Sequence, residues 1–234
     1  MEDLDRLART LRARPPSCGP VRLVAVDGHA GSGKSTFTAR LREALARLPG
    51  PEAPVPVPVP VLHLDDLASH EELFDWTGRL FDQVIGPLAR GADARYAPYD
   101  WNERRFTPAR ALPTAPVVLI EGVGAGRRAL RPHLAALLWM ERDAEDSWLR
   151  GRRRDGEGLT AFWDGWTAAE TRHFSADPSR PFADALVRER PQGYELLPGP
   201  RTNARQNQII TLGDHPAVGW GVVGKPPPGG PNSA

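Results

Sequence analysis

The sequence is poor in cysteine and in long apolar runs, and its charges are nearly balanced. Cys18 is the single cysteine among 234 residues, so neither an intramolecular disulfide framework nor a cysteine-rich zinc site is available. No apolar run approaches the roughly 20 residues of a membrane helix, and the acidic start Met1-Glu2-Asp3 lacks the apolar core of a secretion signal. A net charge of +1 provides no overall attraction to nucleic acid or anionic membranes. These absences predict a cytoplasmic protein that binds neither nucleic acid nor membranes. Whether the protein forms a homo-oligomer is left open.

The chain does contain short apolar strands that alternate with helical stripes. Hydrophobic residues make up 40% and charged residues 25%, which is enough for a buried core. Apolar runs predict strands at 21–26, 61–64, 117–120, 134–140 and 184–187. Leucine-rich stripes predict helices at 2–14, from Phe37 to about Leu48, and at 70–90, 143–154 and 159–174. Continuous apolar strands between helices predict an α/β fold whose parallel sheet is covered on both faces.

The composition also predicts how the chain is divided. Residues 1–195 are expected to form one domain, and the proline- and glycine-rich residues 196–234 are expected to form a mobile tail. Proline alternates with valine over residues 51–60, where each proline removes a sheet hydrogen-bond donor. This segment is therefore predicted to be a stiff, extended linker.

A phosphate-binding motif follows the first predicted strand. The stretch fits G-x-x-x-x-G-K-S/T in full and is made of Gly28, His29, Ala30, Gly31, Ser32, Gly33, Lys34 and Ser35, with Thr36 after it. Glycines let the backbone wrap a triphosphate, and the next helix adds the positive end of its dipole. Lys34 is expected to reach the β- and γ-phosphates of ATP, and the Ser35 hydroxyl to bind Mg²⁺.

A second glycine cluster, Gly122-Val123-Gly124-Ala125-Gly126, suggests a dinucleotide-binding fingerprint instead. Its third glycine would have to stand at 127, where the sequence has Arg127. The phosphate loop is thus the favoured nucleotide site.

Acidic residues end three of the predicted strands. Asp27 follows the first, the pair Asp65-Asp66 follows the second, and Glu121 follows the third. Ligands of open parallel sheets lie beyond the carboxyl ends of the strands. A carboxylate there can hold Mg²⁺ or accept a proton from an attacking hydroxyl, which is the role favoured for Asp65 and Glu121. For Asp66, a structural role at the turn is equally open.

Together these motifs resemble the uridine kinase-like group of P-loop kinases, which includes nicotinamide riboside kinase, phosphoribulokinase and bacterial pantothenate kinase. The resemblance spans about residues 20–190 and also rests on Tyr99-Asp100-Trp101. It implies a P-loop NTPase three-layer sandwich with a mainly parallel five-stranded sheet. It further implies transfer of the ATP γ-phosphate to a small-molecule hydroxyl.

The resemblance also implies roles for single residues. By position, Asp65 matches the catalytic base, and Ser35, Glu121 and Asp65 are the implied magnesium site. Tyr99, Asp100 and Trp101 match the stretch that contacts the nucleoside base. The chain departs from uridine kinases, since Leu67-Ala68 replace an aromatic pair and no histidine follows Trp101 closely.

An arginine cluster falls where small kinases have a lid. Arg150, Arg152, Arg153 and Arg154 lie in one helical segment, about 143–158, with glycines nearby that permit hinge motion. Guanidinium groups neutralise charge as the phosphoryl group moves, and helical spacing places Arg150, Arg153 and Arg154 on one face. Arg150 and Arg154 are the predicted catalytic pair, and a solvated basic face is the alternative.

The aromatic residues of 159–174 have helical spacing, at Phe162, Trp163 and Trp166, together with Leu159. Such a stripe is more often core than a base-stacking platform, so core is predicted. His63 is also predicted to be core. For Trp101, substrate contact and loop packing are both open.

These inferences predict an ATP- and Mg²⁺-dependent kinase for a small molecule, most simply a nucleoside. Kinases for pantothenate, nicotinamide riboside or a nucleotide are the alternatives within that class. A nucleotide-dependent ATPase or switch that acts on a protein partner is the alternative outside it.

Overall fold

The fold is built around a six-stranded sheet, as seen in a computed structural model that describes residues 2–49 and 58–202. The strand order is β10-β9-β8-β1-β7-β2. These strands are β1 (Arg22–Asp27), β2 (Val61–His63), β7 (Val117–Glu121), β8 (Ala136–Met140), β9 (Ala185–Arg190) and β10 (Gly193–Pro198). Five of them are mutually parallel, and β10 pairs antiparallel with β9. The predicted mainly parallel sheet is confirmed, with one strand more than expected.

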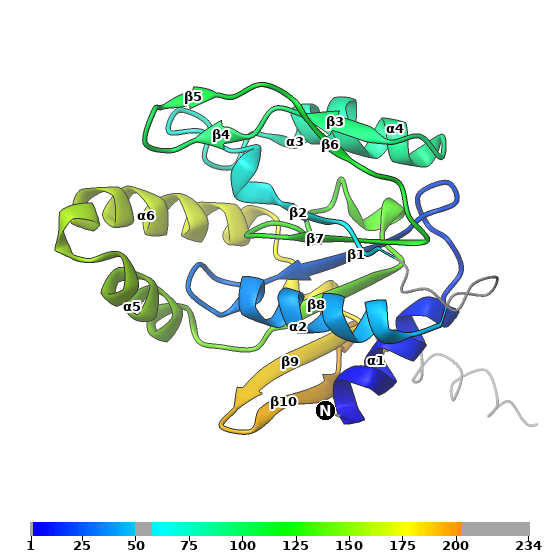
Figure 1. Cartoon of the computed structure of the whole chain (residues 1–234). Coiled ribbons are helices and arrows are strands. Elements are labelled where there is room, and N and C mark those ends of the chain that lie inside the picture. The colour runs from blue at the N-terminus through cyan, green and yellow to red at the C-terminus, as the bar shows by residue number, and fades with distance from the viewer. Residues whose placement is uncertain (1, 50–57, 203–234) are drawn as a thin grey trace, which may run out of the picture.

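Helices cover both faces of this sheet (Figure 1). Along β1, Val24 and Val26 pack with α1 (Glu2–Ala13) and α2 (Lys34–Arg47), while Leu23 and Ala25 face the opposite layer. That layer contains one continuous helical stretch, α3 (Thr77–Leu80), the π-helical turn η2 (Phe81–Ile85) and α4 (Gly86–Ala89). Burial on both sides explains the continuous apolar strands, and the three-layer prediction is confirmed.

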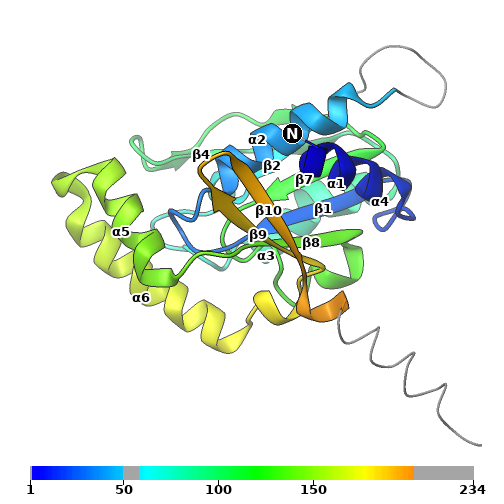
Figure 2. The same ribbon diagram turned by 90° about the horizontal axis from the view of Figure 1, so that it is seen from below.

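Smaller elements enclose one end of the sheet. Two hairpins lie beside β2, formed by β3 (Ala94–Tyr96) with β6 (Arg110–Leu112) and by β4 (Tyr99–Asp100) with β5 (Arg105–Phe106). Two longer helices, α5 (Ala144–Asp155) and α6 (Thr160–Ala176), lie together at one end of the molecule, away from α1 (Figure 2). Four short 3₁₀ turns complete the described ranges, at Leu64–Asp66, Arg131–His133, Glu157–Leu159 and Arg180–Phe182. None of the helices in the described ranges is long and apolar enough to span a membrane.

Two predicted boundaries differ from the structure. The helix predicted at 70–90 begins at Thr77, because residues 70–76 instead form a loop whose Phe74 carbonyl accepts a hydrogen bond from Arg127. The predicted start of the tail falls within β10, so residues 196–198 belong to the sheet. The remainder of that tail from residue 203, and residues 51–57 of the predicted linker, lie outside the described residues.

Candidate active site

The phosphate loop joins β1 to α2 and has a backbone that requires glycine. Gly31 and Gly33 have φ angles of +83° and +96°, in the left-handed region. A Cβ at Gly31 would lie 2.0 Å from the carbonyl oxygen of Ser147 on α5. The Lys34 ammonium donates hydrogen bonds to the carbonyl oxygens of Gly28 and His29, at 3.0 and 2.9 Å. The loop therefore holds its lysine folded back over its own backbone.

A cavity of about 350 Å³ opens in front of this loop and is called the phosphate-loop cavity here. Its lining consists of Ala30, Gly31, Gly33, Lys34, Ser35, Thr36, Asp65, Glu121, Val123, Arg150, Gly151, Arg154 and Trp166. Six of the nine predicted loop residues thus face it. Gly28 and Ser32 are buried and do not line the cavity, and the His29 ring packs among Trp139, Trp148 and Phe174.

Glu121 forms a buried polar centre at the end of β7. Its Oε1 accepts hydrogen bonds from the Ser35 hydroxyl at 2.8 Å and from His63 Nδ1 at 2.6 Å. Burial opposes ionisation, but the His63 hydrogen bond and the charge of Lys34 outweigh it and lower the pKa of the Glu121 carboxyl. His63 is the last residue of β2, and its side chain is 48% exposed, so it is not a core residue as predicted.

The three strand-end aspartates have different surroundings. Asp27 is fully buried and accepts hydrogen bonds from the backbone N–H groups of Gly28, Gly124 and Gly126, so it organises two loops. This contact explains the second glycine cluster as structural. Asp66 accepts hydrogen bonds from Tyr96 and Arg110 and does not line the phosphate-loop cavity.

Asp65 lines the phosphate-loop cavity and belongs to a 3₁₀ turn, Leu64–Asp66, directly after β2. The residue is exposed toward the cavity, but neighbouring protein atoms displace part of the water around the carboxyl and so raise its pKa, and the charges of Glu121 and Asp66 add to this effect. Lys34 acts in the opposite direction. A carboxylate with a raised pKa is a stronger base, which suits proton abstraction from a hydroxyl.

A second cavity, of about 340 Å³, adjoins the first and is called the aromatic cavity here. It is lined by Ala30, Asp65, His70, Trp101, Asn102, Arg154, Asp155, Leu159, Phe162, Trp163 and Trp166. Ala30, Asp65, Arg154 and Trp166 line both cavities. The aromatic stripe of α6 therefore lines a cavity, while Trp163 and Trp166 also pack in a buried cluster. Leu159, in the 3₁₀ turn before α6, is 45% exposed. Both observations correct the prediction of a simple core stripe.

The predicted base-contact stretch is divided by the structure. Trp101 lines the aromatic cavity, and its Nε1 donates to the Asp65 carbonyl oxygen at 3.2 Å. Tyr99 lies behind it, with its hydroxyl 3.0 Å from His70 Nδ1. Asp100 accepts hydrogen bonds from the backbone N–H groups of Asn102 and Glu103 and so stabilises the turn. Of the three, Trp101 is the residue placed beside Asp65.

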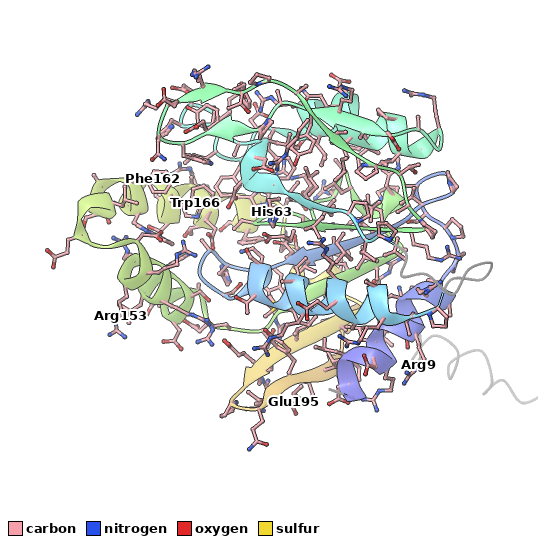
Figure 3. All side chains as sticks on the ribbon, viewed as in Figure 1. Arg9, His63, Arg153, Phe162, Trp166 and Glu195 are labelled. Atoms are coloured by element: carbon pink, nitrogen blue, oxygen red, sulfur yellow. The ribbon has the colours of Figure 1, made fainter. Side chains whose placement is uncertain are left out.

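The arginines of α5 face in different directions. Arg150 and Arg154 both line the phosphate-loop cavity, while Arg153 lies on the outer side of α5 (Figure 3). The prediction that Arg153 shares their face is therefore wrong. Arg150 Nη1 is paired with Glu189 on β9 at 2.7 Å, and Arg154 forms two hydrogen bonds to Asp155.

Several site residues were not predicted from the sequence. His70, Asn102 and Asp155 line the aromatic cavity but stand in no recognisable motif. Glu170 is fully buried on α6 and contacts the phosphate loop, 140 residues earlier in the chain. Such contacts arise only when the chain folds, so the spacing of residues in the sequence holds no signal for them.

Comparisons with known proteins support the fold. No family model matches the sequence, and no curated protein does. Among solved structures, a "possible uridine kinase" from Bacillus stearothermophilus superposes with a TM-score of 0.57 at 18% identity, covering 79% of this chain and 97% of the other. A "putative fructose transport system kinase" from Silicibacter sp. TM1040 gives 0.55 at 23% identity, covering 74% and 94%. The predicted resemblance to uridine kinase-like P-loop proteins is thereby confirmed at the level of the fold.

Proposed function

We propose that this protein is a phosphotransferase that moves the γ-phosphoryl group of ATP to a hydroxyl of a small molecule. The observation that carries the proposal is the position of Asp65, which lines both the phosphate-loop cavity and the aromatic cavity. A base at this junction can reach a hydroxyl held on one side and face a phosphate held on the other. The two structural neighbours named above are both described as kinases, which supports the same reaction class.

The residues of the phosphate-loop cavity suit a nucleoside triphosphate with its magnesium ion. Within the described ranges, no cluster of three or more His, Cys, Asp or Glu could hold a metal by itself. The Ser35 hydroxyl and the ionised Glu121, which touch one another, supply the oxygen ligands that Mg²⁺ prefers once phosphate oxygens complete the shell. Bound magnesium would neutralise negative charge on the phosphates.

The chain's own residues would carry the transfer. Asp65 accepts the proton of the acceptor hydroxyl as that oxygen bonds to the γ-phosphorus and the bond to the β-phosphate oxygen breaks, releasing ADP. Lys34 leaves its loop carbonyls to bind the phosphates. Arg150 and Arg154 face the same cavity and stabilise charge on the phosphoryl group in transit.

The aromatic cavity favours an acceptor with a flat or apolar surface. Trp101, Phe162, Trp163 and Trp166 offer ring faces or edges, and His70 and Asn102 offer hydrogen-bonding groups between them. A nucleoside fits this combination of stacking and polar contacts, and it is the first acceptor to test. A sugar is the second candidate, because tryptophan rings also pack against sugar C–H groups and one neighbour is described as a fructose transport system kinase.

The proposal is tested by ATP consumption and product mass over a panel of nucleosides, sugars, pantothenate and nicotinamide riboside. Wild type is compared with Asp65→Asn and with its neighbour Asp66→Asn, which lies outside the site. Asp65→Asn is expected to lower kcat by about 10²–10⁴-fold while nucleotide binding persists. Tight ATP binding without phosphorylation of any panel member would refute the proposal and turn attention to a protein partner.

A further inference from the structure

Glu170 is a buried carboxylate whose two oxygens each accept two hydrogen bonds. Oε1 accepts from His29 Nδ1 at 2.7 Å and from Trp148 Nε1 at 2.9 Å. Oε2 accepts from the Ala30 backbone N–H at 3.1 Å and from Trp166 Nε1 at 2.9 Å. A carboxylate has about four acceptor positions, so all of them are used.

This carboxylate is held in its charged form. Burial opposes ionisation, but the hydrogen bonds from His29 and Trp148 and the charge of Lys34 outweigh it and lower the pKa of Glu170. Because an ionised carboxylate can only accept, His29 donates through Nδ1. The negative charge of Glu170 opposes the binding of phosphate at the nearby loop. We therefore look for the role of Glu170 in how it positions the four groups that donate hydrogen bonds to it.

The four donors come from three separate parts of the candidate site. His29 and Ala30 belong to the phosphate loop, Trp148 belongs to α5, and Trp166 belongs to α6. Ala30 and Trp166 line both cavities. Each Glu170 oxygen therefore joins one donor of the loop to one donor of the helices that carry the lid arginines and the aromatic wall.

We propose that Glu170 is a positioning residue that couples nucleotide occupancy of the phosphate loop to the placement of α5 and α6. The inference rests on the proposed function in one respect, that a nucleotide binds the phosphate loop. A ligand that fixes the loop fixes the Ala30 N–H and the His29 ring, and through Glu170 the two indoles. By reciprocity, a ligand held by Trp166 stabilises the loop conformation that binds nucleotide.

Glutamine at this position cannot restore the arrangement. In either orientation of the amide, its NH₂ group faces one loop donor and one indole donor, because the four donors are divided in this way between the two oxygens. With the NH₂ group at the Oε2 position, Glu170→Gln breaks the Ala30 and Trp166 contacts. With the NH₂ group at the Oε1 position it breaks the Trp148 contact, while His29 can accept through Nδ1 in its other tautomer, so at least one helix contact is lost in either orientation. Asp164→Asn is the matched control, because Asp164 is also an α6 carboxylate bonded to α5, through Arg152 at 2.8 Å, but it does not contact the loop.

The test measures MgADP binding by calorimetry and the protection of residues 144–155 from hydrogen exchange when MgADP is added. We expect Glu170→Gln to raise the Kd for MgADP about tenfold or more and to abolish the nucleotide-induced protection of α5. Asp164→Asn should behave as wild type in both measurements. A Glu170→Gln protein that matches wild type in Kd and in α5 protection would overturn the proposal.

A further variant keeps the proposal testable if Glu170→Gln does not fold. Trp148→Phe removes the indole donor of α5 and leaves the loop contacts of Glu170 in place, and Trp148 lines neither cavity. We expect this variant to fold, to bind MgADP within about threefold of wild type, and to lose part of the protection of α5. If it only lowers the melting temperature of the free protein and leaves the response to MgADP intact, Glu170 is merely structural.

Failure of the proposed function is separable from failure of this inference. MgADP binding needs no acceptor, so a wild type that binds nucleotide but transfers no phosphate refutes the kinase proposal alone. Loss of coupling in Glu170→Gln would still stand in that case.

Discussion

Asp65 and Asp66 are adjacent carboxylates with opposite surroundings. Asp66 is held by the Tyr96 hydroxyl at 3.0 Å and by Arg110. Asp65 faces the cleft, and the raised pKa of its carboxyl shows that the fold disfavours its charge. Asp65 is thus placed at a cost in stability, as is common for catalytic groups, whereas Asp66 contributes to stability.

This contrast predicts opposite stability changes for the two asparagine variants. A carboxyl whose folded pKa lies above its unfolded value destabilises the fold once pH exceeds the folded pKa, and asparagine carries no such penalty. Asp65→Asn should therefore raise the free energy of unfolding at pH 7, by up to about 1 kcal/mol because water in the cleft screens the charge. Asp66→Asn should lower it by about 1 kcal/mol or more. Denaturant unfolding decides the question, and a loss of stability in Asp65→Asn would contradict it.

The same raised pKa predicts where the reaction fails at low pH. In the proposed transfer Asp65 must be ionised to accept a proton, so kcat/KM should fall with decreasing pH through an acid limb centred above the ordinary aspartate value of about 3.9. Glu121→Gln removes the charge that contributes most to the raised pKa of Asp65. It should move the limb to lower pH even though it also lowers the maximal rate. A limb at or below pH 4 in wild type would exclude Asp65 as the base.

How far single residues could be predicted depended on whether their partners are close in sequence. The phosphate loop is one contiguous segment, and the residues at the ends of parallel strands meet by geometry, so it was predictable that Lys34, Ser35, Asp65 and Glu121 would lie around one cavity. Glu170 was not, because its loop partners lie 140 and 141 residues away. His63 was misread because it is the last residue of β2, and β2 is an edge strand of the sheet, where less of the protein covers the side chain.

At the scale of elements, α5 and α6 approach one another through a glycine. A Cβ at Gly151 of α5 would lie 2.2 Å from Cη2 of Trp163 on α6. Gly165 of α6 has no atom within 4 Å of its Cβ position. The two glycines are both in helix interiors and differ in what an added methyl group meets.

Alanine at these positions should therefore have opposite effects. Gly165→Ala should stabilise the protein by about 0.5–1 kcal/mol, since alanine favours helix. Gly151→Ala should destabilise it by about 1–3 kcal/mol, since Trp163 must move. Because Trp163 also lines the aromatic cavity, Gly151→Ala should raise the acceptor KM more than the ATP KM. Thermal unfolding and steady-state kinetics of the pair test this, and equal stability changes would contradict the close contact.

The pairing of α5 with β9 predicts a gain in nucleotide affinity. Glu189 Oε2 is bonded to Arg150 Nη1 at 2.7 Å, so phosphates must compete with Glu189 for this arginine. An exposed pair of this kind is worth up to about 1 kcal/mol, so Glu189→Gln should tighten ATP binding by up to about fivefold. Glu195→Gln, on the same hairpin but paired with Arg188 and Arg190, is the control and should change nothing. Weaker ATP binding by Glu189→Gln would mean that Arg150 does not serve the phosphates.

The spacing of apolar residues predicted the positions of helices and strands well. It predicted less well whether other protein segments or a cavity lie against their apolar faces. The stripe on α6 indicated a covered face, but such a stripe cannot distinguish cover by protein from cover by a ligand cavity. The apolar stripe across residues 70–90 likewise predicted a helix that starts too early, since the helix begins at Thr77. Ahead of Thr77, tertiary hydrogen bonds hold the backbone, including that from Arg127 to the Phe74 carbonyl, and they override the helical pattern.

At the scale of the whole molecule, the three-layer arrangement could be predicted from the apolar sequences of the strands. Runs that are apolar at every position must be covered on both faces, which predicted the three-layer sandwich. The sixth strand was missed because Gly193–Pro198 contains glycine, glutamate and proline and reads as the start of a tail. Its place is set by antiparallel pairing with β9 through a tight turn at residues 191–192, a contact that composition does not reveal.

The site draws on all of these layers, so nucleotide binding should stabilise the protein as one unit. The phosphate-loop cavity is lined by residues of the loop, β7, α2, α5 and α6, so a ligand there contacts all of these elements. MgATP at 100 times its Kd should add about 2.7 kcal/mol. For a chain of this size, that raises the midpoint of thermal unfolding by about 5–11 °C. Calorimetry of the wild type should show a single unfolding transition whose midpoint rises when MgATP is added.

The control is Lys34→Met, which should fold normally but lose most of this rise in the midpoint. A second, unshifted transition would show that α5 and α6 unfold independently of the nucleotide, and no shift at all in wild type would exclude a nucleotide site at this loop.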